Sequence, residues 1–353
     1  MSIRRASNVL QIVGFRSRPF SSWKLPGQYH DASSNATLGI HVFRCPDAVG
    51  IVAKLSECIA SRGGNIQSID VFVPENKEIF YSRCEFVFDP IRWSRASIDE
   101  DFAKLSKTFN AVKSAVRVPF VDPKYKIAIL ASKQDHCLVD LLYGWQEGRL
   151  PVDITCVISN HQRAPNTHVT RFLERHRIPY YYLPTTSGNK GEDGLLELVT
   201  DTDFLVLARY MQILSEKFLE SYGKDVINIH HGLLPSFKGG NPSKQAYDAG
   251  VKLIGATSHF VTEELDGGPI IEQMVEQVSH RDSLRSFVQK SENLEKQCLW
   301  KAIRSYCELR VLRYEENKTV TLLLPIYCRS RLVHNHQLAQ REQMSVRQIF
   351  YVC

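Results

Sequence analysis

The stretch "INIHHGLLPSFKGGNP", residues 227–242, gives the clearest indication of the fold of the larger part of the chain and of the position of a functional site. It starts inside an apolar run at 225–230 and turns at once into a loop rich in glycine and proline. Ligands of open α/β sheets bind outside the carboxyl ends of the strands. Polar side chains where a buried strand ends therefore indicate a functional site.

The sequence around this stretch alternates short apolar runs with segments of helical spacing. We expect strands at 126–132, 153–159, 203–208 and 225–230, and helices at 137–148, 168–176 and 215–223. Ser215 and Gly223 suit the start and the end of the last of these helices. Such alternation predicts an open, doubly wound, mostly parallel α/β sheet, which we assign to a domain at 125–324.

Residues 38–121 form a second, smaller module. Strands are expected at 38–44, 65–73, 79–88 and 114–121, with helices within 45–64 and at 98–113. Asp47 is the expected N-cap of the first helix, and Gly50 lets another molecule approach its backbone. The order βαββαβ predicts a ferredoxin-like sheet with two helices on one face.

The segment "CPDAVGIVAKL" at 45–55 resembles the strand-to-helix turn of ACT domains. ACT domains bind small metabolites, often amino acids, or hold subunits together. The resemblance implies an amino-acid effector near Asp47 and Gly50, or alternatively a pure assembly role. In either case we expect a homo-oligomer.

The opening stretch places two chemically suited side chains together. Asn228 and His230 lie two apart on one strand and so point to the same face, whereas His231 points away. An amide N–H can stabilise an oxyanion, and an imidazole can move a proton near neutral pH. Downstream, "GATSHFVTEELDGGPIIEQ" at 255–273 adds His259 on a strand and Asp266 at a Gly-Gly-Pro turn. A carboxylate beside an imidazole fixes its tautomer and raises its pKa.

A metal site is the alternative interpretation of these residues. His230, His259 and Asp266 could form a two-histidine, one-carboxylate site. That arrangement leaves Asn228 without a role, so we expect neither a metal nor a cofactor.

The pair "NIH…LLPSFKG" and "SHFV…LDGGPII" resembles the catalytic domain of formyltransferases, over residues 125–320. That family uses 10-formyltetrahydrofolate. The resemblance implies that Asn228, His230 and Asp266 are catalytic and that His259 supports them. It also implies folate contacts from the segment "LARYMQIL" and from the turn before Asp266, at Met211, Gln212, Ile213, Leu214 and Val261. We expect Lys238 to contact the glutamate tail of the folate or, alternatively, to be a solvated loop lysine.

The acceptor of the formyl group is expected to be water. Residues 129–142 contain no glycine that could cradle a phosphate, and Asp135 would repel one. An ACT-like module fused to this domain resembles the formyltetrahydrofolate deformylases of the plant organellar type. The resemblance implies hydrolysis to formate and tetrahydrofolate. Two alternatives stay open, a formyltransferase with another acceptor and a non-catalytic regulator that binds folate or an amino acid.

The two ends of the chain differ from its body. Residues 1–30 hold five basic and no acidic residues and are rich in arginine and serine, which predicts a transit peptide, mitochondrial or alternatively plastid. Residues 325–353 form an atypical tail of net charge +3, expected to be disordered. Since the whole chain carries +6, the body is slightly acidic, and we expect no nucleic-acid partner. No apolar run reaches the roughly 18 residues that a membrane span needs.

Overall fold

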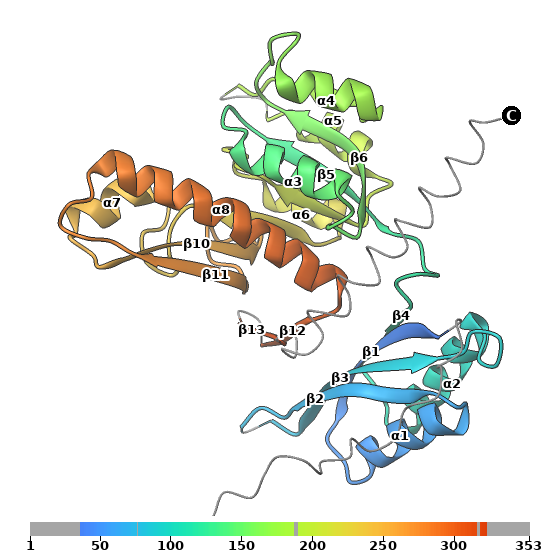
Figure 1. Cartoon of the computed structure of the whole chain (residues 1–353). Coiled ribbons are helices and arrows are strands. Elements are labelled where there is room, and N and C mark those ends of the chain that lie inside the picture. Colours follow the sequence, from blue (N-terminus) through green and yellow to red (C-terminus); the bar gives the residue numbers. More distant parts are fainter. Residues whose placement is uncertain (1–35, 76, 187–189, 316–317, 323–353) are drawn as a thin grey trace, which may run out of the picture. The chain divides into compact units, whose positions relative to one another are not determined.

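The computed structural model describes residues 36–75, 77–186, 190–315 and 318–322 (Figure 1). The predicted transit peptide at 1–30 and the predicted tail at 325–353 lie outside these residues. Among the helices described, none is both long and apolar enough to cross a membrane.

The N-terminal module is the predicted ferredoxin-like sheet with two helices. Its antiparallel strands lie in the order β2-β3-β1-β4. Leu55 of the first helix and Phe102 of the second pack into one core with Phe86 and Trp93 of the β3 region. The elements are β1 (Thr37–Pro46), α1 (Ile51–Ser61), β2 (Asn65–Phe72), β3 (Ile79–Phe88), α2 (Arg95–Thr108) and β4 (Lys113–Arg117).

Three local predictions for this module were wrong, one of them the last strand, which covers Lys113–Arg117 rather than 114–121. Asp47 is not the N-cap of α1, because the helix begins only after Gly50, which has φ 93° and provides no side chain for a cap. The backbone N–H of Asp47 instead donates to the carbonyl of Glu78. Helix α2 covers 95–108 rather than 98–113, because the hydroxyl of Ser94 caps its start and Asn110, at φ 49°, follows its end.

The second module is built on a seven-stranded sheet in the order β11-β10-β9-β8-β5-β6-β7. The five strands from β9 to β7 are parallel, whereas β10 and β11 are antiparallel to their neighbours. This confirms the mostly parallel sheet. The strands are β5 (Tyr125–Ala131), β6 (Val152–Ser159), β7 (Tyr180–Tyr182), β8 (Phe204–Leu207), β9 (Val226–His230), β10 (Leu253–Phe260) and β11 (Ile270–Gln277), followed by the hairpin β12 (Val311–Glu315) and β13 (Lys318–Thr321).

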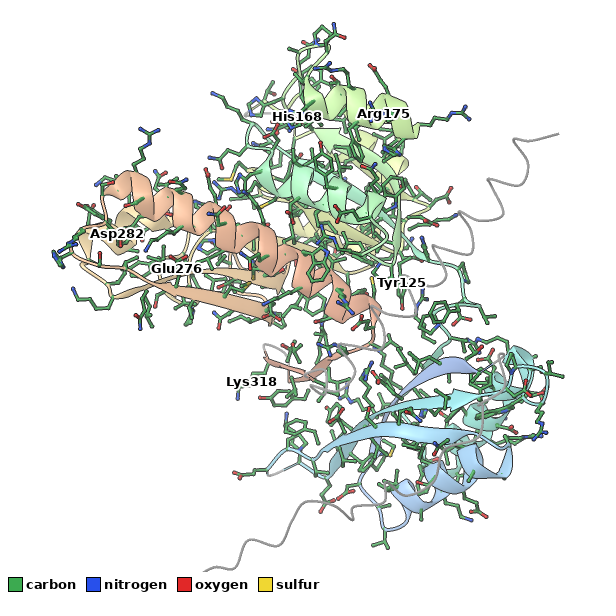
Figure 2. All side chains as sticks on the ribbon, in the orientation of Figure 1. Tyr125, His168, Arg175, Glu276, Asp282 and Lys318 are labelled. Carbon is green, nitrogen blue, oxygen red and sulfur yellow. The ribbon has the colours of Figure 1, made fainter. Side chains whose placement is uncertain are left out.

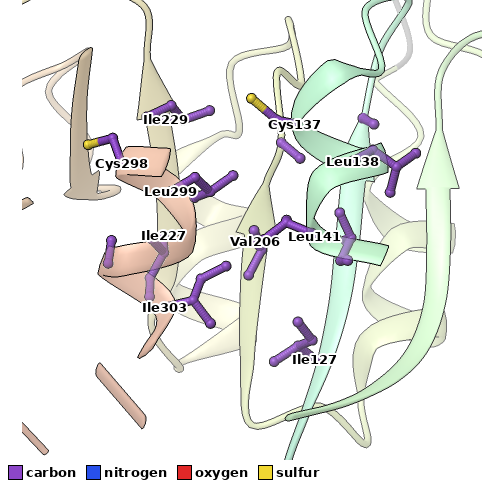
Figure 3. Packing of buried hydrophobic residues seen from close by; sticks show 14 of the residues in the cluster. Ile127, Cys137, Leu138, Leu141, Val206, Ile227, Ile229, Cys298, Leu299 and Ile303 are labelled. Carbon is purple, nitrogen blue, oxygen red and sulfur yellow. The ribbon is translucent and has the colours of Figure 1, made fainter. Parts of the chain in front are cut away.

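Helices cover both faces of this sheet. On one face, Leu138 and Leu141 of α3 meet Leu299 and Ile303 of α8 over the central strands (Figure 3). On the other face, α5 and α6 pack onto a separate core. Figure 2 shows His168 and Arg175 marking the length of α4. The helices are α3 (His136–Gln146), α4 (His168–His176), α5 (Glu192–Val199), α6 (Glu216–Tyr222), α7 (Pro242–Asp248) and α8 (Leu284–Cys307).

The predicted boundaries of α6 are confirmed. The hydroxyl of Ser215 accepts the backbone N–H of Phe218 at 3.1 Å, and Gly223 ends the helix at φ 62°. A short connection joins the end of this helix to β9, and the candidate site lies at the carboxyl end of β9.

Candidate active site

Strand pairing brings the predicted catalytic side chains together. Asn228 and His230 lie near the carboxyl end of β9, in the middle of the sheet. Strand β10 pairs with β9 so that His259 lies directly opposite Asn228. His230 and His259 are both buried, at 3% and 2% exposure. The site therefore stands on two adjacent, rigid strands.

The partners of His259 fix its protonation state and the orientation of Asn228. Nδ1 of His259 lies 2.8 Å from the carbonyl oxygen of Phe260, which can only accept, so Nδ1 carries the proton. Burial is the main cause that lowers the pKa of His259, so its ring is neutral and Nε2 is an acceptor. Nδ2 of Asn228 lies 3.1 Å from that Nε2 and donates to it. This bond determines which way the amide of Asn228 points.

His230 lies between two acceptors. Its Nδ1 is 3.3 Å from Oδ2 of Asp266, and its Nε2 is 3.0 Å from the carbonyl oxygen of Phe237. An N–H on Nδ1 donates to the carboxylate, which leaves Nε2 as the nitrogen that can take up or give up a proton. Burial alone would raise the pKa of Asp266, but hydrogen bonds from His230 and from the backbone N–H of Gly239 lower it to about 2. The carboxylate is therefore charged beside His230.

Backbone geometry at the turn after β10 presents this carboxylate. Asp266 has φ 53°, in the left-handed region that side chains other than glycine rarely adopt. Strain of this kind tends to gather at functional sites. Two residues later the chain needs a glycine, Gly268, because a Cβ at this position would overlap the carbonyl oxygen of Phe260. The turn thus aims Asp266 at His230, with 8% of its side chain exposed.

Asn228, His230 and Asp266 line a cavity of about 230 Å³. Five of the six predicted folate contacts line this cavity: Met211, Gln212, Ile213, Leu214 and Val261. Met211 and Ile213 keep more than half of their surface exposed, which provides an apolar wall. Lys238 does not line it; its Nζ pairs with Oε1 of Glu264 at 2.8 Å on the exposed rim.

Sequence reasoning missed a buried charged group beside this cavity. Nε2 of His136 lies 2.7 Å from Oε2 of Glu295, and Nε of Arg209 lies 3.4 Å from the same oxygen. Nε of Arg209 also donates to Oε1 of Gln134 at 2.9 Å. Of these residues, only Arg209 could have been found from the sequence, because it belongs to the segment "LARYMQIL" that was expected to contact folate. Glu295 lies in an ordinary amphipathic helix pattern.

His136, Cys137 and Glu295 are close enough to hold a metal ion. Their surroundings favour a buried carboxylate paired with Arg209 instead. Burial raises the pKa of the Cys137 thiol well above its ordinary value, which disfavours a thiolate ligand. Burial also works against the charge of Glu295, but the hydrogen bond from His136 and the charge of Arg209 hold its pKa below the ordinary value.

Comparison with known proteins agrees with this geometry. Residues 125–303 match the Formyl transferase family. A crystal structure of glycinamide ribonucleotide transformylase 1 from Symbiobacterium toebii is 28% identical with a TM-score of 0.52, covering 57% of this chain and 95% of that one. The fold and the site thus define a protein of the formyl transferase class.

Two further relatives identify the branch of that class. Formyltetrahydrofolate deformylase 2, mitochondrial, of Arabidopsis thaliana is 67% identical over 325 residues, which is 90% of this chain and 99% of the relative. A crystal structure of a formyltetrahydrofolate deformylase from Pseudomonas syringae pv. tomato is 39% identical with a TM-score of 0.73, covering 83% of this chain and 96% of that one. The chain belongs to the formyltetrahydrofolate deformylase family.

Proposed function

We propose that the chain hydrolyses 10-formyltetrahydrofolate to formate and tetrahydrofolate, with Asn228, His230 and Asp266 as the catalytic residues. The observation that carries this assignment is their position in one cavity, next to the apolar wall around Met211. Membership of the deformylase family supplies the substrate class.

Asn228 acts on the formyl oxygen. One of its amide protons is engaged by Nε2 of His259, so the other N–H is held in a fixed direction. A fixed donor stabilises the oxyanion that forms when water adds to the formyl carbon. His259 is thus a supporting residue that orients Asn228.

His230 and Asp266 handle the protons. Water attacks the formyl carbon, and the tetrahedral intermediate then collapses with cleavage of the bond between this carbon and the folate nitrogen. The ring of His230 takes one proton from the attacking water and gives one to the leaving nitrogen, while its Nδ1 stays beside Asp266. The charged Asp266, 3.3 Å from Nδ1, stabilises the protonated ring. These steps use neither a metal nor a cofactor.

The folate occupies the remainder of the cavity. The apolar side chains of Met211, Ile213 and Val261 suit the flat face of a pterin, and nearby backbone groups suit its polar edge. Lys238 stays our candidate for the glutamate tail, because its exposed pair with Glu264 is easily exchanged for another carboxylate.

Formate release from 10-formyltetrahydrofolate by the chain lacking residues 1–30 tests the assignment. His230→Ala and Asp266→Asn should each lower kcat by about 10²-fold or more, because each removes part of a general acid–base pair. Tetrahydrofolate binding, followed by fluorescence titration, should change much less. Turnover close to that of the unchanged chain in either variant would contradict the mechanism.

The mitochondrial relative and the basic composition of residues 1–30 support import into mitochondria, with plastids as the alternative. A reporter fused to residues 1–30 should enter mitochondria and lose this segment. Retention in the cytosol would count against the proposal, and entry into plastids would select the alternative.

The N-terminal module is proposed to bind an amino-acid effector near Asp47 and Gly50 and to support a homo-oligomer. Gly50, at φ 93°, leaves the start of α1 open, because a side chain there would meet nothing within 4 Å. Light scattering and activity assays with each free amino acid would test these two points.

A further inference from the structure

The strand order of the larger sheet marks a second place where a ligand could sit. After β5 the chain moves outward through β6 and β7, then returns to place β8 and β9 on the other side of β5. The carboxyl ends of β5 and β8 therefore flank the point where the strand order reverses. In doubly wound sheets this is the usual binding crevice.

Four polar or charged side chains lie near this point: Gln134, His136, Arg209 and Glu295. We call them the switch-point network. Gln134 and His136 follow β5, Arg209 follows β8, and Glu295 projects from α8. Glu295 is 2% exposed, and its second oxygen accepts the hydroxyl of Ser291 at 3.0 Å. The network thus ties two strand ends to a helix that packs over them.

Arg209 is the centre of this network and is held from several sides. Its Nε faces both Gln134 and Glu295, its Nη2 also donates to Gln134, and its carbonyl accepts the backbone N–H of Ser132 at 3.2 Å. Its backbone has φ 64°, a conformation that glycine adopts with less strain. Backbone strain of this kind tends to occur at functional sites.

Arg209 also borders the catalytic cavity. It lines the same cavity as Asn228, His230 and Asp266, and its charge is one of the causes, after burial, that lower the pKa of His231 to about 3. Its Nη1 is buried and has no hydrogen-bond partner among the residues that the structure describes. The side chain thus lines the catalytic cavity, contacts the switch-point network and carries one N–H that is unpaired within the described part of the chain.

We propose that Arg209, held by Gln134 and Glu295, determines the acceptor by closing the crevice to amines and leaving room for water. This inference rests on the proposed function. Hydrolysis and formyl transfer break the same carbon–nitrogen bond and release the same tetrahydrofolate. They differ in the nucleophile: water gives formate and a proton, and a primary amine R–NH₂ gives the formamide R–NH–CHO, its lost proton balancing the one that the folate nitrogen gains.

The direct test is to open the crevice and measure where the formyl group goes. The chain lacking residues 1–30 is given 10-formyltetrahydrofolate with a labelled formyl group, together with glycinamide as a primary amine. The unchanged protein should yield labelled formate with only a trace of formylglycinamide, which sets the reference ratio. Arg209→Gly, which also suits φ 64°, should raise the ratio of formylglycinamide to formate by about tenfold or more, the range that one changed pocket contact gives.

Two further variants make the test decisive. Gln134 is exposed, so Gln134→Ala should leave the fold intact while it releases Arg209, and the ratio should rise by a smaller factor. Arg163→Gln is the matched control: this arginine is 11% exposed at the neighbouring strand end and pairs with Asp135, but does not line the cavity. Its ratio should not change.

The outcomes separate the two hypotheses. If the unchanged protein releases no formate, the proposed function fails. If it does release formate, but formylglycinamide forms with neither Arg209→Gly nor Gln134→Ala, or forms equally with Arg163→Gln, the role of Arg209 is wrong. If Arg209→Gly does not fold, Gln134→Ala decides alone.

Discussion

At the residue scale, one neutral histidine controls the direction of one amide. His259 is fixed as the Nδ1–H tautomer by the carbonyl of Phe260, and its bare Nε2 then selects the nitrogen of Asn228. A donor in a fixed direction contributes most where charge develops, because it does not have to reorient during the reaction. The reactivity of Asn228 is therefore set by a neighbour on the adjacent strand.

This arrangement predicts unequal effects of two substitutions at Asn228. Asn228→Ala removes the oxyanion donor and should lower kcat by about 10²–10³-fold. Asn228→Asp should be worse, because a carboxylate repels the oxyanion and places an acceptor against the acceptor Nε2 of His259. Single-turnover kinetics separate this loss from folate binding. Greater activity in Asn228→Asp than in Asn228→Ala would exclude the oxyanion role.

The residues that we propose as catalytic could be selected from the sequence, whereas their supporting contacts could not. Asn228, His230 and Asp266 lie in two short motifs whose spacing and turn chemistry carry the information. The contact of Arg209 with Glu295 joins residues far apart in the chain, and nothing in a helix with an amphipathic pattern marks Glu295 as charged and buried. Contacts of this kind depend on packing between elements, which spacing does not encode.

At the scale of elements, the turn after β10 connects folding to catalysis. Phe260 ends the strand, its N–H donates to the carbonyl of Pro269, and its own carbonyl accepts from His259. Gly268 packs against that carbonyl so closely that any Cβ would displace it. The glycine in this turn is therefore required by close approach, in addition to the turn chemistry that the sequence indicated.

Gly268→Ala is predicted to damage stability and activity together. Relief of the overlap with Phe260 should cost about 1–3 kcal/mol of unfolding free energy, as overpacking usually does, and kcat should fall because His259 moves. Gly194→Ala is the control, since its Cβ would meet only Leu183 at 3.9 Å, and an alanine in α5 should stabilise slightly. Urea unfolding and formate release measure both effects; equal behaviour of the two variants would refute the prediction.

Element boundaries show where sequence patterns lose precision. The strand and helix order of the smaller module, and most of the order from β5 to β9 in the larger one, could be predicted from apolar periodicity, whereas α7, α8 and the hairpin β12–β13 were not predicted. The start of α1 could not be predicted, because Gly50 adopts a left-handed conformation three residues after the expected cap at Asp47. A polar residue near a helix start suits both a cap and a preceding turn, and here the backbone N–H of Asp47 bonds to Glu78 across the module.

At the scale of the whole molecule, buried neutral histidines link stability to pH. His41 lies in the core of the N-terminal module, with Nε2 3.0 Å from the hydroxyl of Ser114 and its ring stacked on Phe102 at 4.0 Å. Burial lowers the pKa of His41 to about 3. Burial and the charge of Arg209 do the same for His231 in the larger module. Each module thus holds at least one histidine that stays uncharged in weak acid.

The sign of the resulting pH dependence follows from proton counting. An unfolded histidine takes up a proton near pH 6.5, whereas folded His41 does so only near pH 3. Between these values the unfolded chain binds more protons, so the unfolding free energy falls as the pH drops, by up to about 1.4 kcal/mol per pH unit for each such histidine. The carboxyl of Asp266 has a pKa of about 2 in the folded protein. Its contribution to the unfolding free energy therefore decreases only when the pH falls below its ordinary pKa of 3.8.

The chain should therefore lose stability steadily from pH 6.5 towards pH 4, before carboxylates titrate. His41→Gln keeps a polar partner for Ser114 but removes one of the protons taken up on unfolding, so its slope against pH should be shallower by about one proton. Calorimetry between pH 4.5 and 6.5 gives this slope directly. An identical slope in His41→Gln would mean that His41 is already charged in the folded protein, and the core of the N-terminal module would then have to provide a counter-charge for its ring.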